Sequence, residues 1–345
     1  MIAPLHRRAN DIAPVAFPVL IADIGGTNVR LAVLADAHST LREFATVQTS
    51  DFADFAEAAS KTVLDTTSIM PKSLLIALAG PVRSGPMKLT NADWVIDPGA
   101  LMDVLNLQTL ITFNDFEALS LSLPALKEDQ VMQIGGGEAQ RRAPRVVLGP
   151  GTGLGVAALV YGDQRYMPVP GEGGHMDFGP ITARDFAIWP HLERIQGRVT
   201  GEAVLSGNGL ARIYRAIASA DGADPAACTS GADVTQRAQE GDAIADEAID
   251  LFLTYLGRFA GDLALMFLAR GGVFVAGGIG PRLEDRFPTS GFRKAFEGKA
   301  PHEEICGPTP TFLVTEPRPA VAGLATFAVM PERFMLDLSG RRFDQ

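Results

Sequence analysis

A pattern that occurs twice in the chain constrains its fold more than any other feature. The segments IADIGGTNVRLAVL (residues 21–34) and VVLGPGTGLGVAALV (residues 146–160) each run from an apolar strand through a glycine- and threonine-containing turn into a second apolar strand. Chance similarity of two glycine-rich strands is the alternative reading. Because a matching strand flanks both sides of each turn, we favour a duplicated structural unit, with the two turns 126 residues apart from Asp23 to Gly149.

The remaining elements predict an α/β fold, in which strands alternate with helices. Apolar runs typical of buried strands and residues recurring at helical spacing follow one another along the chain. The predicted strands are residues 74–80, 110–113 and 271–278, and the predicted helices are residues 50–64, 116–123, 210–220, 243–269 and 320–330. We expect the last helix to return and pack on the first lobe.

The length of 345 residues predicts two lobes, because single cores rarely grow beyond about 250–300 residues. We expect an N-terminal extension over residues 1–18. A small α/β lobe would span residues 19–124 and be completed by a C-terminal helical segment, residues 318–345. A large α/β lobe would span residues 125–317.

Composition excludes several classes of function. The formal net charge is −10, so we expect no nucleic-acid partner, although small phosphates held by backbone N–H groups remain possible ligands. The two cysteines, Cys228 and Cys306, have neither disulfide-framework nor zinc-site spacing. Neither a signal-peptide core nor an uncharged apolar run of about 18 residues occurs, so we expect a cytoplasmic protein with no membrane partner.

The first turn, DIGGTN, is a candidate phosphate-binding segment. Gly25 and Gly26 let successive N–H groups converge on an anion, and Thr27 adds a hydroxyl group. Asp23 stands at the strand end, where its carboxylate could orient a hydrated metal ion without binding it directly. An ordinary hairpin turn explains this segment, taken alone, equally well. A Walker A loop is excluded because GK[ST] is absent, and a Rossmann fingerprint because a strand follows the glycines.

Two further glycine segments extend the candidate site. The second turn, GPGTGLG (residues 149–155), could hold a polyphosphate from the side opposite the first turn. The third, VAGGI (residues 275–279), follows a buried strand. Paired glycines at such a place often serve only close packing; as part of the set, Gly277 and Gly278 would leave room for a purine against the backbone.

Asn114 and Asp115 follow the strand pattern LITF and precede a helix. Asn114 is a good N-cap, and Glu117 would complete a capping box. Asp115 also stands at the carboxyl end of a strand, where it could accept the proton of an attacking hydroxyl group. Spacing alone favours the cap, and both roles are compatible if Asn114 caps through one atom and binds through another.

PGEGGH (residues 170–175) and Glu202 offer further polar side chains. The ExxH spacing of Glu172 and His175 would suit a metal pair on a helix, but the surrounding glycines argue against a helix. A curved segment that presents a carboxylate and an imidazole suits vicinal hydroxyl groups; a solvated loop is the alternative. Glu202, in TGEA, could simply complement a helix N-terminus.

Seven motifs together resemble bacterial glucokinases of the proteobacterial type, over about residues 19–330. PGEGGH and the LSGxGL segment are specific to this group, whereas DxGGT is shared with many sugar kinases and actin-like ATPases. The cysteine-rich motif of repressor-type (ROK) sugar kinases is missing, and residues 1–18 extend beyond the usual start of the family. The motifs, in order, are DIGGTN, LTNADW, FNDFEALSLSLP, GPGTGLG, PGEGGHMDFGP, LSGNGLARIYRAI and GGVFVAGGIGPR.

The resemblance implies a fold, a site and partners. The fold is the two-lobed hexokinase/actin/chaperone-like ATPase fold, with duplicated ribonuclease-H-like lobes and a central cleft, and the family expectation is a homodimer. Asp115 matches the general base, and the glucose-hydroxyl ligands are matched by Asn114, Asp115, Glu172, His175 and Glu202. The ATP-binding segments are matched by Ala22, Asp23, Ile24, Gly25, Gly26, Thr27, Gly149, Gly151, Thr152, Gly153, Gly277 and Gly278.

The implied reaction is transfer of a phosphoryl group from ATP, with Mg²⁺, to the 6-hydroxyl of glucose, which would feed glycolysis or the Entner-Doudoroff route. Three alternatives stay open. The chain could prefer another hexose, could be a sugar-sensing regulator without turnover, or could be an actin-like ATPase without a sugar. The last of these leaves PGEGGH unexplained.

Overall fold

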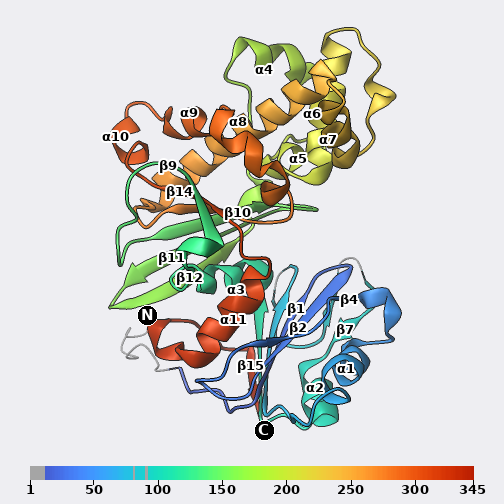
Figure 1. Cartoon of the computed structure of the whole chain (residues 1–345), viewed down its shortest axis with the longest axis vertical. Coiled ribbons are helices and arrows are strands. Elements are labelled where there is room, and N and C mark those ends of the chain that lie inside the picture. The colour runs from blue at the N-terminus through green and yellow to red at the C-terminus, as the bar shows by residue number, and fades with distance from the viewer. Residues whose placement is uncertain (1–11, 81, 90–91) are drawn as a thin grey trace, which may run out of the picture. The chain divides into compact units, whose positions relative to one another are not determined.

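The computed structural model describes residues 12–80, 82–89 and 92–345, which form two compact units (Figure 1). The first unit contains the described residues up to Leu126, together with Leu159–Pro170 and Glu316–Gln345. The second contains Lys127–Ala158 and Gly171–Thr315. Residues 1–11 of the extension, and Thr90 and Asn91 of the LTNADW motif, lie outside the described residues. The predicted domain boundaries stay a prediction, and they do not foresee the grouping of residues 159–170 with the first unit.

The first unit is built on a mixed sheet whose strands run in the order β15-β8-β5-β1-β2-β3, with β4 also paired to β2. Its strands are β1 (Val19–Ile24), β2 (Asn28–Leu34), β3 (Arg42–Glu43), β4 (Val47–Gln48), β5 (Ser73–Leu78), β8 (Thr109–Asn114) and β15 (Arg342–Asp344), with β6 (Met87–Lys88) and β7 (Val95–Ile96) pairing separately. Its helices are α1 (Phe55–Ala59), α2 (Pro98–Leu105), α3 (Asp115–Ser122) and α11 (Pro319–Val329).

The second unit has a sheet in the order β12-β11-β10-β13-β14-β9 and most of the helices. Its strands are β9 (Val131–Gly135), β10 (Arg145–Pro150), β11 (Leu154–Gly162), β12 (Arg165–Gly171), β13 (Val273–Val275) and β14 (Thr311–Val314). Its helices are α4 (Ala183–Ile188), α5 (Gly201–Val204), α6 (Gly207–Ala220), α7 (Gly231–Gln239), α8 (Ala243–Phe267), α9 (Phe292–Glu297) and α10 (Glu303–Cys306). The long helix α8 packs against α6, α7, α9 and β10.

The two sheets share one topology, which confirms the predicted duplication. The order β3-β2-β1-β5-β8 in the first sheet corresponds to β12-β11-β10-β13-β14 in the second. In the first sheet β1 runs parallel to β5 and β5 to β8; in the second, β10 runs parallel to β13 and β13 to β14. An antiparallel strand then follows in each, β15 beside β8 and β9 beside β14.

One predicted helix begins later than the sequence pattern indicated. The pattern over residues 50–64 predicted a continuous helix, but α1 begins at Phe55. Asp54 is its N-cap, and its side chain accepts a hydrogen bond of 2.8 Å from the N–H of Glu57. Because an N-cap residue has extended backbone, the preceding residues cannot belong to the same helix. The helical path then continues as a π-helical turn over Ser60–Leu64.

The C-terminal helix returns to the first unit, as predicted. It does not extend over residues 318–345 as expected, because α11 ends at Val329 and residues 342–344 form strand β15. Helix α11 lies beside α3 and also contacts β1 and β5 (Figure 1). The approach to α3 is close because a Cβ atom on Gly323 would stand 1.9 Å from the carbonyl oxygen of Ala118. Within the described residues, no helix has both the length and the apolar character needed to cross a membrane.

We expect Gly323→Ala to destabilise the protein, because the added methyl group overlaps the backbone of α3. Overpacking of this kind costs about 1–3 kcal/mol, or about 2–4 °C of unfolding temperature per kcal/mol in a unit of this size. Thermal unfolding measures the change. The matched control is Gly99→Ala in α2, where the nearest atom to the new Cβ is Asp97 Oδ1 at 3.5 Å. Equal unfolding temperatures for the two variants would contradict the expectation.

Candidate active site

The first glycine turn connects β1 to β2, which confirms the predicted hairpin. The N–H of Gly25 donates to the carbonyl oxygen of Asn28 at 2.9 Å and closes the turn. Thr49 holds the turn from outside, because its N–H donates to the carbonyl oxygen of Thr27 at 2.9 Å. Thr27 itself is exposed, and Gly26 is half-buried. The turn therefore presents backbone and a hydroxyl-bearing residue at the surface of the first unit, and phosphate binding there stays a prediction.

Asp23 has a cross-strand partner that sequence reasoning missed. The antiparallel register places Arg30 opposite Asp23, and Arg30 Nη1 donates to Asp23 Oδ2 at 2.9 Å. Burial raises the pKa of Asp23, and the Arg30 guanidinium opposes that rise. The hairpin register was the signal that could have found this pair, since a four-residue turn between the paired residues Ile24 and Val29 fixes which residues face each other.

Asn114 forms the predicted N-cap at the junction of β8 and α3. Its Oδ1 accepts hydrogen bonds from the N–H groups of Phe116 and Glu117, at 3.0 and 3.1 Å. The Glu117 carboxylate in turn accepts a hydrogen bond of 3.3 Å from the N–H of Asn114, which completes the capping box. The Nδ2 group, expected to be left for a ligand, donates one hydrogen bond to the carbonyl oxygen of Gly80 at 3.1 Å. An amide has a second N–H, so ligand binding stays compatible with the cap.

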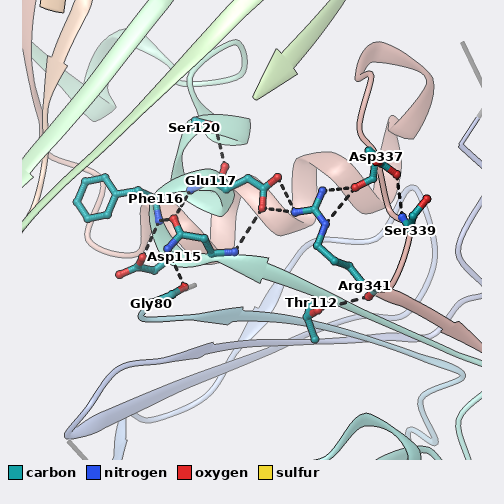
Figure 2. Close-up of polar contacts among 10 residues, drawn as sticks. Gly80, Thr112, Asp115, Phe116, Glu117, Ser120, Asp337, Ser339 and Arg341 are labelled. Atoms are coloured by element: carbon teal, nitrogen blue, oxygen red, sulfur yellow. Dashed lines mark hydrogen bonds and ion pairs between the residues drawn. The ribbon is translucent and has the colours of Figure 1, made fainter. Parts of the chain in front are cut away.

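Asp115 is the first residue of α3, directly after the cap. Its Oδ1 accepts a hydrogen bond of 2.9 Å from the N–H of Phe116 (Figure 2). Carboxylates are stabilised in the first turn of a helix by the unpaired N–H groups there. The side chain is therefore held at the end of a central strand, as the sequence predicted for this position.

The second glycine turn lies against the third glycine segment within the second unit. The turn connects β10 to β11, and the N–H of Gly151 donates to the carbonyl oxygen of Gly153 at 2.8 Å. The N–H of Ile279 donates to the carbonyl oxygen of Pro150 at 3.2 Å. Gly277 has φ +82°, and a Cβ there would stand 2.6 Å from the Pro150 oxygen. Gly277 thus allows close packing against the second turn, and a purine beside Gly277 and Gly278 stays a prediction.

Glu202 is tied directly to the second glycine turn. It lies in the first turn of α5, where Thr200 is the N-cap. Its Oε2 accepts a hydrogen bond of 2.9 Å from the N–H of Leu154. A Cβ on Gly153 would stand 2.4 Å from the same oxygen. A side chain at this position would have to displace the Glu202 carboxylate, a coupling that the sequence pattern did not reveal.

Glu172 precedes a short 3-10 turn, Gly173–His175, of which His175 is the last residue, so PGEGGH forms no α-helix, as expected. The N–H of His175 donates to the carbonyl oxygen of Glu172 at 3.0 Å. The side chains are exposed, with Nε2 of His175 and Oε2 of Glu172 3.9 Å apart. A carboxylate and an imidazole are thus presented together at the surface of the second unit.

A polar cavity in the second unit brings several of these residues together. Its volume is about 340 Å³, within the range of small-molecule sites. Among its lining residues are Thr152, His175 and Glu202, all predicted from sequence, and also Arg198 and Asn208, which were not. Arg198 Nη2 donates to the carbonyl oxygen of His175 at 2.9 Å, and its Nε donates to Asp177 at 2.8 Å. No motif marks Arg198, because only the fold brings it beside the PGEGGH segment.

The topology and the site define a protein class, and comparison with known proteins then gives the family. Two α/β units of one topology, each with a glycine turn after its first central strand, define the predicted hexokinase/actin-like ATPase fold class. The chain belongs to the glucokinase family, whose family model matches residues 20–330.

Individual relatives and solved structures agree with the family assignment. A glucokinase of Chelativorans sp. (strain BNC1) is 50% identical over 328 residues, which cover 95% of this chain and 96% of that protein. The crystal structure of a glucokinase from an Antarctic psychrotroph is similar with a TM-score of 0.82 and 32% identity, over 90% of this chain and 98% of that chain. A ROK family glucokinase from Streptomyces griseus shares the fold alone, with a TM-score of 0.59 and 19% identity.

Family membership confirms the predicted resemblance and the predicted enzyme class, an ATP-dependent hexose kinase. A glucokinase of Rhizobium etli is 46% identical over 340 residues, which cover 98% of this chain. The family model begins at residue 20, and the N-terminal extension expected over residues 1–18 stays a prediction.

We expect Gly153→Ala to weaken glucose binding, because its methyl group would displace the Glu202 carboxylate. Loss of a hydrogen bond to a charged group costs about 1.5–3 kcal/mol, so the KM for glucose should rise by about 10- to 100-fold. Steady-state kinetics at saturating ATP measure it. The control is Gly162→Ala, at the far end of β11, where no atom lies within 4 Å of the new Cβ. A parental KM for Gly153→Ala would show that Glu202 does not hold the sugar.

Proposed function

We propose that this chain transfers the γ-phosphoryl group of ATP to the 6-hydroxyl of glucose, with Asp115 as the general base. The observation that carries the proposal is the position of Asp115. It follows directly after Asn114, which ends β8 and caps α3, and its Oδ1 accepts a hydrogen bond from the N–H of Phe116. Asp115 would accept the proton of the 6-hydroxyl while the oxygen attacks the γ-phosphorus and ADP leaves. Because the transition state is loose, positioning and charge neutralisation supply most of the catalysis.

Substrate recognition is proposed for residues of both units. Asn114, Asp115, Glu172, His175 and Glu202 would pair with the hydroxyl groups of glucose, and the cavity beside His175 and Glu202 supports this assignment. A buried site that pairs with hydroxyl groups rejects an epimer by about 1–3 kcal/mol per unmade hydrogen bond. ATP would be held by its phosphates at Ala22, Asp23, Ile24, Gly25, Gly26, Thr27, Gly149, Gly151, Thr152 and Gly153, and by its adenosine at Gly277 and Gly278.

Mg²⁺ is proposed as the accompanying cation, with Asp23 acting on it through bound water. When bound, Mg²⁺ would neutralise charge on the ATP phosphates. Asp23 stands at the end of β1 beside the first glycine turn, and its ion pair with Arg30 holds the carboxylate in place.

We further propose a cytoplasmic homodimer; mass measurement in solution tests the dimer.

The proposed reaction is tested with a coupled assay containing ATP, Mg²⁺ and a panel of hexoses. We expect kcat/KM for glucose to exceed that for mannose and other epimers by at least about tenfold, since one unmade hydrogen bond has about that effect. A higher value for another hexose would reassign the substrate. Sugar-independent ATP hydrolysis, or glucose binding without turnover, would contradict the proposal.

Asp115→Asn should lower kcat by about 10²–10⁴-fold, because an amide cannot accept the hydroxyl proton. The same side chain can still accept a hydrogen bond from the N–H of Phe116, so the affinity for glucose should change little. Kinetics give kcat, and titration calorimetry gives the Kd for glucose. Near-parental turnover in this variant would show that another group is the base.

As the pH is lowered, MgATP-dependent activity should be lost at a higher pH in Arg30→Met than in the parental protein. Arg30 opposes the burial that raises the pKa of Asp23, so its removal raises that pKa further. The carboxylate then takes up a proton at a higher pH and loses the charge that orients Mg²⁺. The pH profile of kcat/KM for MgATP measures the shift, and Arg30→Lys, which retains the positive charge, is the control. An identical acid limb in both variants would argue against the role of Asp23.

A further inference from the structure

The helix that presents Asp115 begins over a buried carboxylate. The Glu117 side chain is 2% exposed, lies two residues after Asp115, and accepts the hydrogen bond from the N–H of Asn114. A buried carboxylate is strongly unfavourable unless a cation or several donors compensate it. The position of Asn114 and Asp115 therefore depends on whatever neutralises Glu117.

The compensating cation comes from the C-terminal end of the chain. Arg341 Nη1 lies 2.9 Å from Oε1 and 2.7 Å from Oε2 of Glu117, 224 positions away in the sequence (Figure 2). The Arg341 side chain is 19% exposed. Its Nε and Nη2 both donate to the carbonyl oxygen of Asp337, with the Nε contact at 3.1 Å. The guanidinium is thus held at a fixed place by its own loop before it reaches Glu117.

Arg341 also contacts the strand that precedes Asn114. Its carbonyl oxygen accepts a hydrogen bond of 3.0 Å from the N–H of Thr112, and the Thr112 hydroxyl lies 3.4 Å from the same oxygen (Figure 2). Thr112 is fully buried in β8, two residues before Asn114. The next residue, Arg342, pairs with Ile111 in the ladder between β15 and β8. One residue therefore bonds to β8 through its backbone and to α3 through its side chain.

We propose that Arg341 is a positioning residue for Asp115, acting through Glu117 and Thr112. The proposal rests on the role given to Asp115 in the proposed function. Loss of the guanidinium would leave the buried Glu117 carboxylate without its cation, so the first turn of α3 would shift or open. A misplacement of about 1 Å at a reacting group can lower the rate by about 10²-fold. Glucose also has proposed ligands in the second unit, so affinity should suffer less than turnover.

The expected result for Arg341→Met is a fall in kcat of about 10- to 100-fold, with the KM for glucose changed less than about threefold. The matched control is Arg342→Met in the same segment. Its guanidinium is similarly covered, at 17% exposure, but it pairs with Asp344, which is 52% exposed and lies outside α3. Surface pairs of that kind contribute little, so Arg342→Met should retain parental kcat.

A double variant separates charge compensation from loss of packing. Removing one partner of a buried ion pair is far more damaging than replacing both. Glu117→Gln with Arg341→Met leaves no buried charge, and the Gln amide oxygen can still accept from the N–H of Asn114. We expect this double variant to recover at least about tenfold in kcat over Arg341→Met alone. A double variant no better than Arg341→Met would overturn the proposal, as would equal kcat values for Arg341→Met and Arg342→Met.

Hydrogen exchange tests the positioning role of Arg341 without measuring activity. A failure of that proposal can therefore be distinguished from a failure of the proposed function. The amides of Phe116 and Glu117 should exchange faster in Arg341→Met than in Arg342→Met, and unchanged exchange would overturn the proposal. If Arg341→Met does not fold, Arg341→Lys makes the same comparison. It retains the charge but loses the forked contact with Asp337, so kcat should fall with KM preserved. A parental kcat and parental exchange in Arg341→Lys would then be the overturning result.

Discussion

Burial of the central strands on both faces is the constraint on which the rest of the structure depends. β5 is buried along its whole length, and β1, β8 and β10 are buried at all but one position each. Strands covered on both sides have no place for a charged side chain along their length. Charged side chains and candidate ligand groups therefore occur where the strands end. Asp23, Asn114 and the second glycine turn all stand at such ends, which is why the candidate site is divided among short segments.

At each of these strand ends, a carboxylate is held by a partner from another part of the chain. Asp23 pairs with Arg30, Glu117 pairs with Arg341, and Glu202 accepts a hydrogen bond from the N–H of Leu154. Such contacts fix the side chains before any ligand arrives, which reduces the loss of freedom on binding. Within the second unit, the second glycine turn is thus linked to Glu202 through this hydrogen bond, and a change in either is expected to alter the other.

The duplication explains both the similarity and the difference between the units. Each has the same order of central strands, and each places a glycine turn after its first central strand. The first unit places a capped helix carrying Asp115 after the third parallel strand of this order, β8. The second unit instead inserts helices α4 to α8 between β12 and β13, and it is these insertions that supply Glu202 and the cavity. A common scaffold therefore carries the proposed base in one half and most of the proposed sugar ligands in the other.

The sequence by itself determined the features that depend on near neighbours. These are the glycine turns, the capping box of Asn114 and Glu117, the central strands and the fold class, because hydrophobic spacing and turn chemistry act over a few residues. It could not locate the start of α1, which Asp54 sets by capping. Only the tertiary structure decided that Arg341 neutralises Glu117, that Glu202 reaches the second turn, and that Arg198 lies beside His175. Those contacts join residues 224, 48 and 23 positions apart. Local sequence patterns cannot predict these contacts, because the partners meet only when whole elements pack together.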